Sequence, residues 1–257
     1  MSLWGLKRQV RIAAVFFLFA LLPVAALVVY LLWERPTCDD GRQNGGETGV
    51  DCGGSCLLVC SAEANAALVA WARRFEVSPG RYNVVSYVEN PNVGAEARDV
   101  PYRFRLLDPD GVPIATREGT VTLRPLFSTP IVENGLATGA RAVSKVEFAF
   151  LASPVWQRAA PREPVVVVAD ERLSADAAEP RVVATVENVS LFPIRNLFVV
   201  AIVYDATGNA VGASRTVVER LEPDSRQTLT FTWAAPFSPP GASIEIVPLY
   251  DAPGGAR

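Results

Sequence analysis

Histidine is absent from this chain of 257 residues, and only two lysines, Lys7 and Lys145, accompany 22 arginines. The missing histidine removes the side chain that most often serves as a general base near neutral pH, a neutral metal ligand or a pH switch. No serine stands in a G-x-S-x-G turn, and no glycine-rich phosphate loop occurs. We therefore expect no enzyme and no cofactor, and no small-molecule substrate is evident.

Charge is missing from one long stretch, residues 12–33, which read IAAVFFLFALLPVAALVVYLLW. As a helix this run spans about 33 Å, enough for a hydrocarbon core of about 30 Å. Residues 1–11 carry three basic side chains and no acid, so the positive-inside rule makes them a cytoplasmic tail. We expect a single-pass transmembrane helix at the cell membrane, with residues 34–257 extracytoplasmic. The alternative is a cleavable signal peptide that ends near Ala26.

Basic residues are too few outside this tail to bind polyanions. Beyond residue 11, 27 acidic residues face 21 basic ones. A net acidic domain is a poor ligand for nucleic acid, so we expect no nucleic-acid partner. The abundance of Ala, Val and Arg is typical of proteins from GC-rich bacterial genomes, which favours the periplasm or the surface of a bacterium.

Cysteine is scarce, and all four copies, Cys38, Cys52, Cys56 and Cys60, fall within residues 34–62. An even number of clustered cysteines outside the cytoplasm predicts two disulfides. Three connectivities are open. The alternative is a structural zinc site, but only the last three cysteines have spacings that such sites use.

Oxygen-bearing side chains lie between these cysteines, interspersed with glycines. Flexible loops of this composition suit calcium, which takes about six to eight oxygen ligands. The alternative is a polar, turn-rich loop that needs no ion. The stretch CDDGRQNGGETGVDCGGSC resembles a short cysteine-rich motif of bacterial surface and secreted proteins. The calcium ligands would be Asp39, Asp40, Asn44, Glu47 and Asp51.

From residue 67 onward, short runs rich in Val, Phe, Tyr and Leu alternate with turn residues, which predicts an all-β structure. The pattern also repeats itself. Three stretches recur in order: VVSYVEN at 84–90 with VVATVEN at 182–188, FRLLDPDG at 104–111 with AIVYDATG at 201–208, and VEFAF at 146–150 with LTFTW at 229–233. The two members of the last match are closer together in the chain than those of the first two matches. This difference implies about 14 extra residues in the first copy, including a long loop, PLFSTPIVENGLATG.

The repeat predicts two tandem domains, residues 66–160 and 164–257, joined near 159–164. Each has the length and strand number of an immunoglobulin-like β-sandwich. Residues 67–77 would form the first strand, although 61–75 also fits a helix capped by Ser61. A mainly β fold preceded by a transmembrane helix and a small disulfide-rich segment is the expected architecture.

The strand-to-turn stretches carry a resemblance to a known family. Phe104-Arg105-Leu106-Leu107-Asp108 and Ala201-Ile202-Val203-Tyr204-Asp205 are similar to the signature of FxLYD domains, which are small extracytoplasmic β-sandwiches of bacteria. The first stretch keeps the Phe of the signature, which the second lacks, and the second keeps the Tyr, which the first lacks. A wider similarity is to type-2 late embryogenesis abundant domains. The resemblance implies the fold. The equal places of the two stretches in the repeat imply that Phe104 and Leu106 overlie Ala201 and Val203.

Candidate polar residues in the repeats fit structural roles better than catalytic ones. Asp and Gly three positions apart mark tight turns, and we assign this role to Asp108 with Gly111 and to Asp205 with Gly208. Asn90 and Asn188 end equivalent strands and would cap turns. The three tryptophans of the repeats would pack in cores or between domains; they are Trp71, Trp156 and Trp233.

These features favour a membrane-anchored, non-enzymatic binding or scaffolding protein of the bacterial cell envelope. Its expected partners are the membrane and other envelope proteins. One alternative is a subunit of an envelope or secretion membrane complex. Another is an envelope stress-protection protein, which the similarity to late embryogenesis abundant domains suggests.

Overall fold

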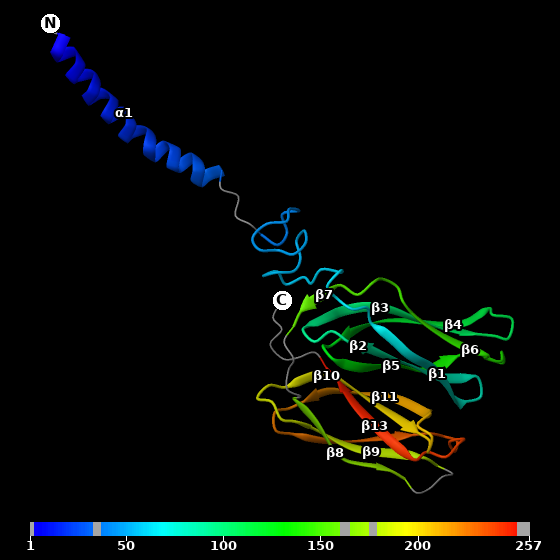
Figure 1. The fold of residues 1–257 in the computed structure, drawn as a ribbon. Coiled ribbons are helices and arrows are strands. Elements are labelled where there is room, and N and C mark those ends of the chain that lie inside the picture. The colour runs from blue at the N-terminus through cyan, green and yellow to red at the C-terminus, as the bar shows by residue number, and fades with distance from the viewer. Residues whose placement is uncertain (1–2, 33–36, 160–164, 175–178, 251–257) are drawn as a thin grey trace. The chain divides into compact units, whose positions relative to one another are not determined.

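The structure, a computed structural model, describes residues 3–32, 37–159, 165–174 and 179–250. The chain divides into two compact units, residues 1–56 and 57–257. The first is one helix followed by a loop, and the second is built of β-strands (Figure 1). The unit boundary falls inside the predicted cysteine-rich segment 34–62, of which residues 34–36 lie outside the described residues.

The first unit begins with helix α1, Leu3–Leu32, so a helix forms where the sequence predicts one. Pro23 stands inside it, and Phe16 is 73% exposed. The last residue of the predicted segment, Trp33, lies outside the described residues. No helix in the described part of the chain is both long and apolar enough to be recognised as a membrane span.

The second unit consists of strands and loops, which confirms the mainly β fold. Strand β1 also confirms that residues 67–77 are extended rather than helical. Strands β1 to β7 lie within residues 66–160 and β8 to β13 within 164–257, while 160–164 of the predicted linker lie outside the described residues. The strands are β1 (Leu68–Ser78), β2 (Arg81–Asn90), β3 (Ala95–Leu107), β4 (Pro113–Leu123), β5 (Phe127–Ala137), β6 (Lys145–Phe150), β7 (Trp156–Arg158), β8 (Val166–Leu173), β9 (Arg181–Asn188), β10 (Ile194–Tyr204), β11 (Ala210–Leu221), β12 (Arg226–Thr232) and β13 (Ser243–Leu249).

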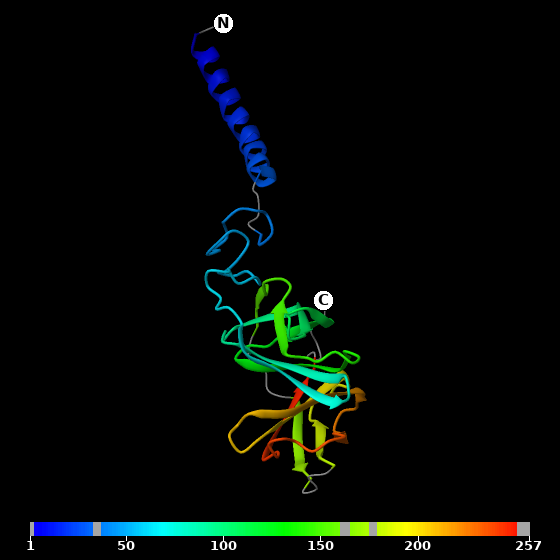
Figure 2. The ribbon, with the colours of Figure 1, turned by 90° about the vertical axis from the view of Figure 1, so that its right-hand side faces the viewer.

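These strands form four antiparallel sheets that stack in layers (Figures 1 and 2). The first sheet pair is β4-β3-β6, with β7 added on β3, over β1-β2-β5; a core around Phe104 and Val84 fills the space between them. The second sheet pair is β11-β10-β13 over β12-β9-β8, with a core around Ala201 and Val182. A third apolar cluster joins β1-β2-β5 to β11-β10-β13, so all four sheets form one stack.

The second sheet pair repeats the strand order and register of the first. On one sheet of each pair, Val85 faces Val132 and, 98 positions later, Val183 faces Thr230. On the other sheet, strand β3 has β4 and β6 as neighbours, and β10 has β11 and β13. Leu106 lies opposite Ala115 and Val146, and Val203, 97 positions later, lies opposite Gly212 and Ile244.

This register corrects one of the three sequence matches. The match of 146–150 with 229–233 is wrong, because β6 pairs with β3 whereas β12 pairs with β9, in the other kind of sheet. The true counterpart of β6 is β13. Short apolar pentapeptides with alternating polarity resemble one another in any strand, so they cannot identify which sheet a strand joins.

The inner faces of the stack are apolar, whereas the equivalent outer face of the first pair is charged. Val200 and Ile202 of β10 are fully buried between the sheet pairs. Their counterparts on β3, 97 positions earlier, are Arg103 and Arg105, which form ion pairs with glutamates of neighbouring strands. The same strand position is therefore used for packing in one pair and for facing solvent in the other.

Candidate functional site

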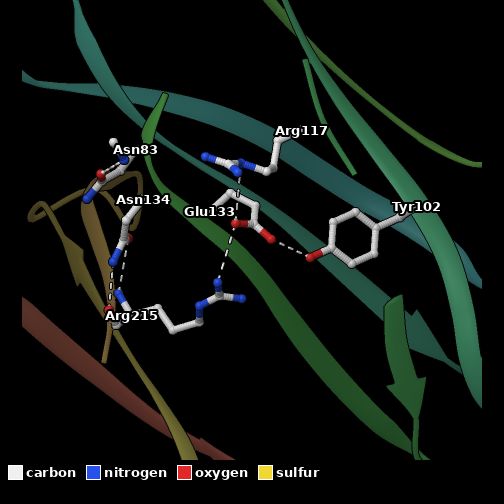
Figure 3. A network of polar contacts seen from close by, with 7 residues as sticks. Asn83, Tyr102, Arg117, Glu133, Asn134 and Arg215 are labelled. Atoms are coloured by element: carbon white, nitrogen blue, oxygen red, sulfur yellow. Dashed lines mark hydrogen bonds and ion pairs between the residues drawn. The ribbon is translucent and has the colours of Figure 1, made fainter. Parts of the chain in front are cut away.

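A cleft of about 460 Å³ opens where the two sheet pairs meet. Its walls come from β3 and the edge strands β4 and β5 of the first pair, and from β10, β11 and β13 of the second. Figure 3 shows the polar network at one side. The ionisable side chains that line the cleft include Asp99, Arg124, Glu133 and Arg215.

A bulge in β5 positions one of these side chains. The pairing of β2 with β5 shifts between Tyr82 and Val84, which leaves β5 with one extra residue. Gly135 takes a positive φ of 68° within the bulge, a conformation that glycine adopts without strain. The Asn83 side-chain oxygen accepts a hydrogen bond from the Gly135 amide at 2.9 Å. The residue just before the bulge, Glu133, lines the cleft.

Glu133 is the centre of the network in Figure 3, and its side chain is only 12% exposed. The Tyr102 hydroxyl donates to one carboxylate oxygen at 2.7 Å. Arg215 lies 3.3 Å and Arg117 4.0 Å from the other oxygen. Burial, followed by the bond to Glu133, raises the pKa of Tyr102. Tyr102 also requires Gly119 on β4, because a Cβ there would lie 2.5 Å from its hydroxyl oxygen.

Side-chain amides from the first pair bind the backbone of β11 in the second. Asn134 donates to the Arg215 carbonyl at 2.6 Å and accepts from the Arg215 amide at 3.3 Å. Asn83 donates to the Ala213 carbonyl at 2.9 Å. These contacts satisfy backbone groups of an edge strand that would otherwise need water or another strand. They hold β5 and β11 in a fixed relation beside the cleft.

A second polar cluster secures the junction of the two pairs. Tyr87 and Tyr204 donate to the two oxygens of Glu245, at 2.5 and 2.6 Å. Trp71 stacks on Tyr87 with ring centroids 5.4 Å apart. Burial raises the pKa of both tyrosines most, and the hydrogen bond to Glu245 raises it further. Together with the apolar cluster that joins the same sheets, the two polar clusters make the junction a packed interface.

The cysteines confirm the predicted disulfides. Cys38 is bonded to Cys56, and Cys52 and Cys60 are disulfide-bonded as well. The zinc alternative is wrong, because sulfurs held in disulfides cannot serve as thiolate ligands. The nearest approach to a metal-binding group there, Cys38 and Cys56 with Glu47, contains such a disulfide.

The acidic loop uses its carboxylates as hydrogen-bond acceptors for its own backbone. Asp51 accepts from the Gly41 amide at 3.0 Å, and Glu47 accepts from the amides of Asn44 and Asp51. Asp40 accepts from the side chain of Asn44 at 2.9 Å, which is the main cause of its lowered pKa. These bonds account for three of the carboxylates without a cation, so calcium at this loop stays a prediction.

The two Asp–Gly turns have the geometry that a structural role requires. Asp108 accepts from the Val112 amide at 2.8 Å, and Asp205 accepts from the Asn209 amide at 2.9 Å. The glycine of each turn, Gly111 or Gly208, takes a positive φ. Hydrogen bonds lower the pKa of both aspartates, chiefly from the Val112 amide to Asp108 and from the Thr207 side chain to Asp205. Neither aspartate lines the cleft beside Glu133.

The cleft itself was missed by the sequence analysis. The stretch PLFSTPIVENGLATG, interpreted as a long loop, contains β5. Pro130 and Gly135 read as loop residues, but an edge strand tolerates proline and a bulge favours glycine. Of the tryptophans, Trp156 and Trp233 are buried in the two cores and Trp71 packs at the junction, as predicted.

Comparisons with known proteins add little to this geometry. No family model matches the chain, and no curated protein matches it. Among solved structures, red sea bream transglutaminase matches with a TM-score of 0.24 and 10% identity. The match covers 70% of this chain and 31% of that one. At such a low TM-score the likeness supports no conclusion about fold or activity.

Proposed function

We propose that this chain is a non-enzymatic binding or scaffolding protein of the bacterial cell envelope, displayed on a membrane anchor. Its binding part would be two tandem FxLYD-like, immunoglobulin-like sandwiches. The observation that carries the proposal is the cleft of about 460 Å³ between the sheet pairs. Concave sites at domain junctions are common places for ligands, and here strands rather than loops form most of the walls.

The side chains around the cleft support binding rather than catalysis. The chain has no histidine, and the described residues contain no free cysteine. The buried carboxylate, Glu133, is already occupied by Tyr102 and Arg215. Tyrosine is protonated near neutral pH, and burial raises the pKa of Tyr102 further, so this hydroxyl serves as a hydrogen-bond donor rather than a base.

The anchor part of the proposal rests on the sequence. The uncharged run 12–33 follows a tail with three basic residues and no acid. A helix occupies this run through Leu32. Apolar side chains on several sides of the helix are exposed, among them Phe16, Phe17 and Phe19. A lipid environment would cover them.

A pair of matched substitutions tests the role of the cleft. Phe198 of β10 and Val217 of β11 lie opposite each other and are both exposed, but only Phe198 lines the cleft. Phe198→Ala should remove part of the apolar wall of the cleft, and Val217→Ala removes a similar exposed side chain outside it. After crosslinking in native membranes, partners that depend on the cleft should be lost from Phe198→Ala and retained by Val217→Ala. Equal recovery of every partner by the two variants would refute a binding role for this cleft.

Protease treatment of intact spheroplasts tests the anchor separately. Residues 34–257 should be degraded while α1 and the short N-terminal tail remain protected. Lysed spheroplasts provide the control in which the tail is degraded as well. Protection of the β-sheet unit in intact cells, or a mature N-terminus just after Ala26, would contradict the proposed topology.

A further inference from the structure

Arg124 is a half-buried cation beside two aromatic rings of the described residues. It follows β4 at the edge of the cleft, and its guanidinium lies 3.8 Å from the ring centroid of Phe127 and 5.4 Å from that of Tyr250. No carboxylate of the described residues forms an ion pair with it. Burial lowers the pKa of Arg124, which reflects its reduced contact with water. A guanidinium fixed between rings presents its N–H donors in a defined direction.

Thr129 contributes an unused hydroxyl to the same cleft. Its side chain is 1% exposed, and its hydroxyl has no hydrogen-bond partner in the described part of the chain. A buried hydroxyl without a partner is destabilising, because it has lost its hydrogen bonds to water and gained none in return. A hydrogen-bonding ligand in the cleft would remove that cost. The cavity therefore contains a guanidinium, Arg124, whose side-chain partner is Tyr250 rather than a carboxylate of the described residues. It also contains the hydroxyl of Thr129, which no described residue bonds, and the two residues come from separate segments.

The remaining charges permit an anion. Glu133 does not repel one strongly, because Arg215 and Arg117 neutralise it. Asp99 lines the cleft too and is exposed, which disfavours ligands with several negative charges. The other wall offers Phe198 and the adjoining strand β13, so the cavity has an apolar side.

We propose that the cleft binds a carboxylate carried on an apolar or aromatic body, with Arg124 and Thr129 donating hydrogen bonds to the carboxylate. Planar carboxylates match the fork of guanidinium donors, and such charge-assisted bonds are among the strongest in proteins. The inference rests on the proposed binding function. Either a free organic acid or the C-terminal carboxylate of a peptide provides this chemistry.

Four probes separate these possibilities, using the full chain in lipid nanodiscs and saturation-transfer NMR. They are N-acetylphenylalanine, its neutral amide, the peptide acetyl-Ala-Ala-Ala-Phe with a free C-terminus, and the amide of that peptide. We expect the acids to bind at least about tenfold more tightly than the amides, because only the acids form the charge-assisted bond. A tighter acid peptide would identify peptide C-termini as the source, and a tighter single amino acid would identify small free acids.

Variants assign the effect to the two donors. Arg124→Gln should weaken acid binding by about tenfold or more, and Thr129→Val, which is nearly isosteric, should weaken it severalfold. Arg103→Gln, on the outer face, is the matched control and should leave binding unchanged. Urea unfolding of each variant verifies that it folds.

Two results would overturn the inference: acids that bind no better than amides, or Arg124→Gln binding acids as the unmodified chain does. Loss of acid binding with intact cleft-dependent partner capture would reject only the ligand class. Loss of partner capture as well would reject the binding function.

Discussion

Asn188 ends strand β9 and is fully buried, and four hydrogen bonds depend on its side chain. It donates to the carbonyls of Phe192 and Leu221, at 2.9 and 3.0 Å. It accepts from the amide and the hydroxyl of Ser190, at 3.0 and 2.7 Å. The equivalent residue of the first pair, Asn90, makes corresponding bonds to the Leu123 carbonyl and to residue 92. The side chain thus joins the β9–β10 turn to β11.

Asn188→Ala should therefore destabilise the protein strongly. Each of the four bonds contributes about 0.5–1.5 kcal/mol net, and the buried carbonyls lose their partner, so we expect about 3–5 kcal/mol in total. Urea unfolding of the full chain in detergent, followed by tryptophan fluorescence, measures the change. Trp233, buried in the same core, reports on this sheet pair.

Thr185→Ala is the control on the same strand. The Thr185 hydroxyl makes one exposed hydrogen bond, to Thr228, so its loss should cost less than about 1 kcal/mol. If Asn188→Ala changed the free energy of unfolding by no more than this control, the reasoning about the buried amide would be refuted. A large effect of Asn188→Ala that Asn188→Asp fully rescued would also refute it, because a carboxylate cannot donate to the two carbonyls.

Three further results are expected. The pKa of Tyr87 and of Tyr204 is raised in the folded protein, so above pH 10 the unfolded chain loses these phenol protons first and the free energy of unfolding should fall as pH rises. The double variant Tyr87→Phe with Tyr204→Phe should make this fall less steep between pH 9 and 11. An unchanged slope would count against the role of these tyrosines. Arg103→Val with Arg105→Ile should make the outer face apolar and cause self-association in analytical ultracentrifugation, which a strictly monomeric variant would contradict. Mass spectrometry of the non-reduced chain should show two hydrogens lost for each of two disulfides, and free thiols would disprove the oxidised state.

Much of the β-structure was predictable because local patterns specify it. The VVSYVEN and VVATVEN repeats identify strands whose counterparts do occupy equivalent places. Strand β5 was not predictable, since Pro130 and Gly135 indicate a loop unless the strand is known to lie at an edge and to bulge. The position of β13 was missed because β12 resembled β6 more closely in sequence.

The cleft was less accessible to sequence reasoning than the strands. Glu133 and Arg215 are 82 positions apart, and no motif connects them. Their neighbourhood follows from the stacking of β1-β2-β5 on β11-β10-β13, which is a property of two whole sheet faces. Polar residues such as Asn83 read as turn formers, yet here they bind the backbone of another sheet.

The junction joins two different faces, since β1-β2-β5 of the first pair meets β11-β10-β13 of the second. Such a head-to-tail contact is heterologous, so it does not close on itself and a further copy would stack in the same way. The outer faces of β4-β3-β6 and β12-β9-β8 differ from the two faces that meet at the junction. Arg105 occupies the position equivalent to Ile202, and Thr185 the position equivalent to Tyr87. These substitutions act like the polar caps of a solenoid. A few surface side chains, rather than the fold, therefore distinguish the outer faces of the stack from the faces that meet at the junction.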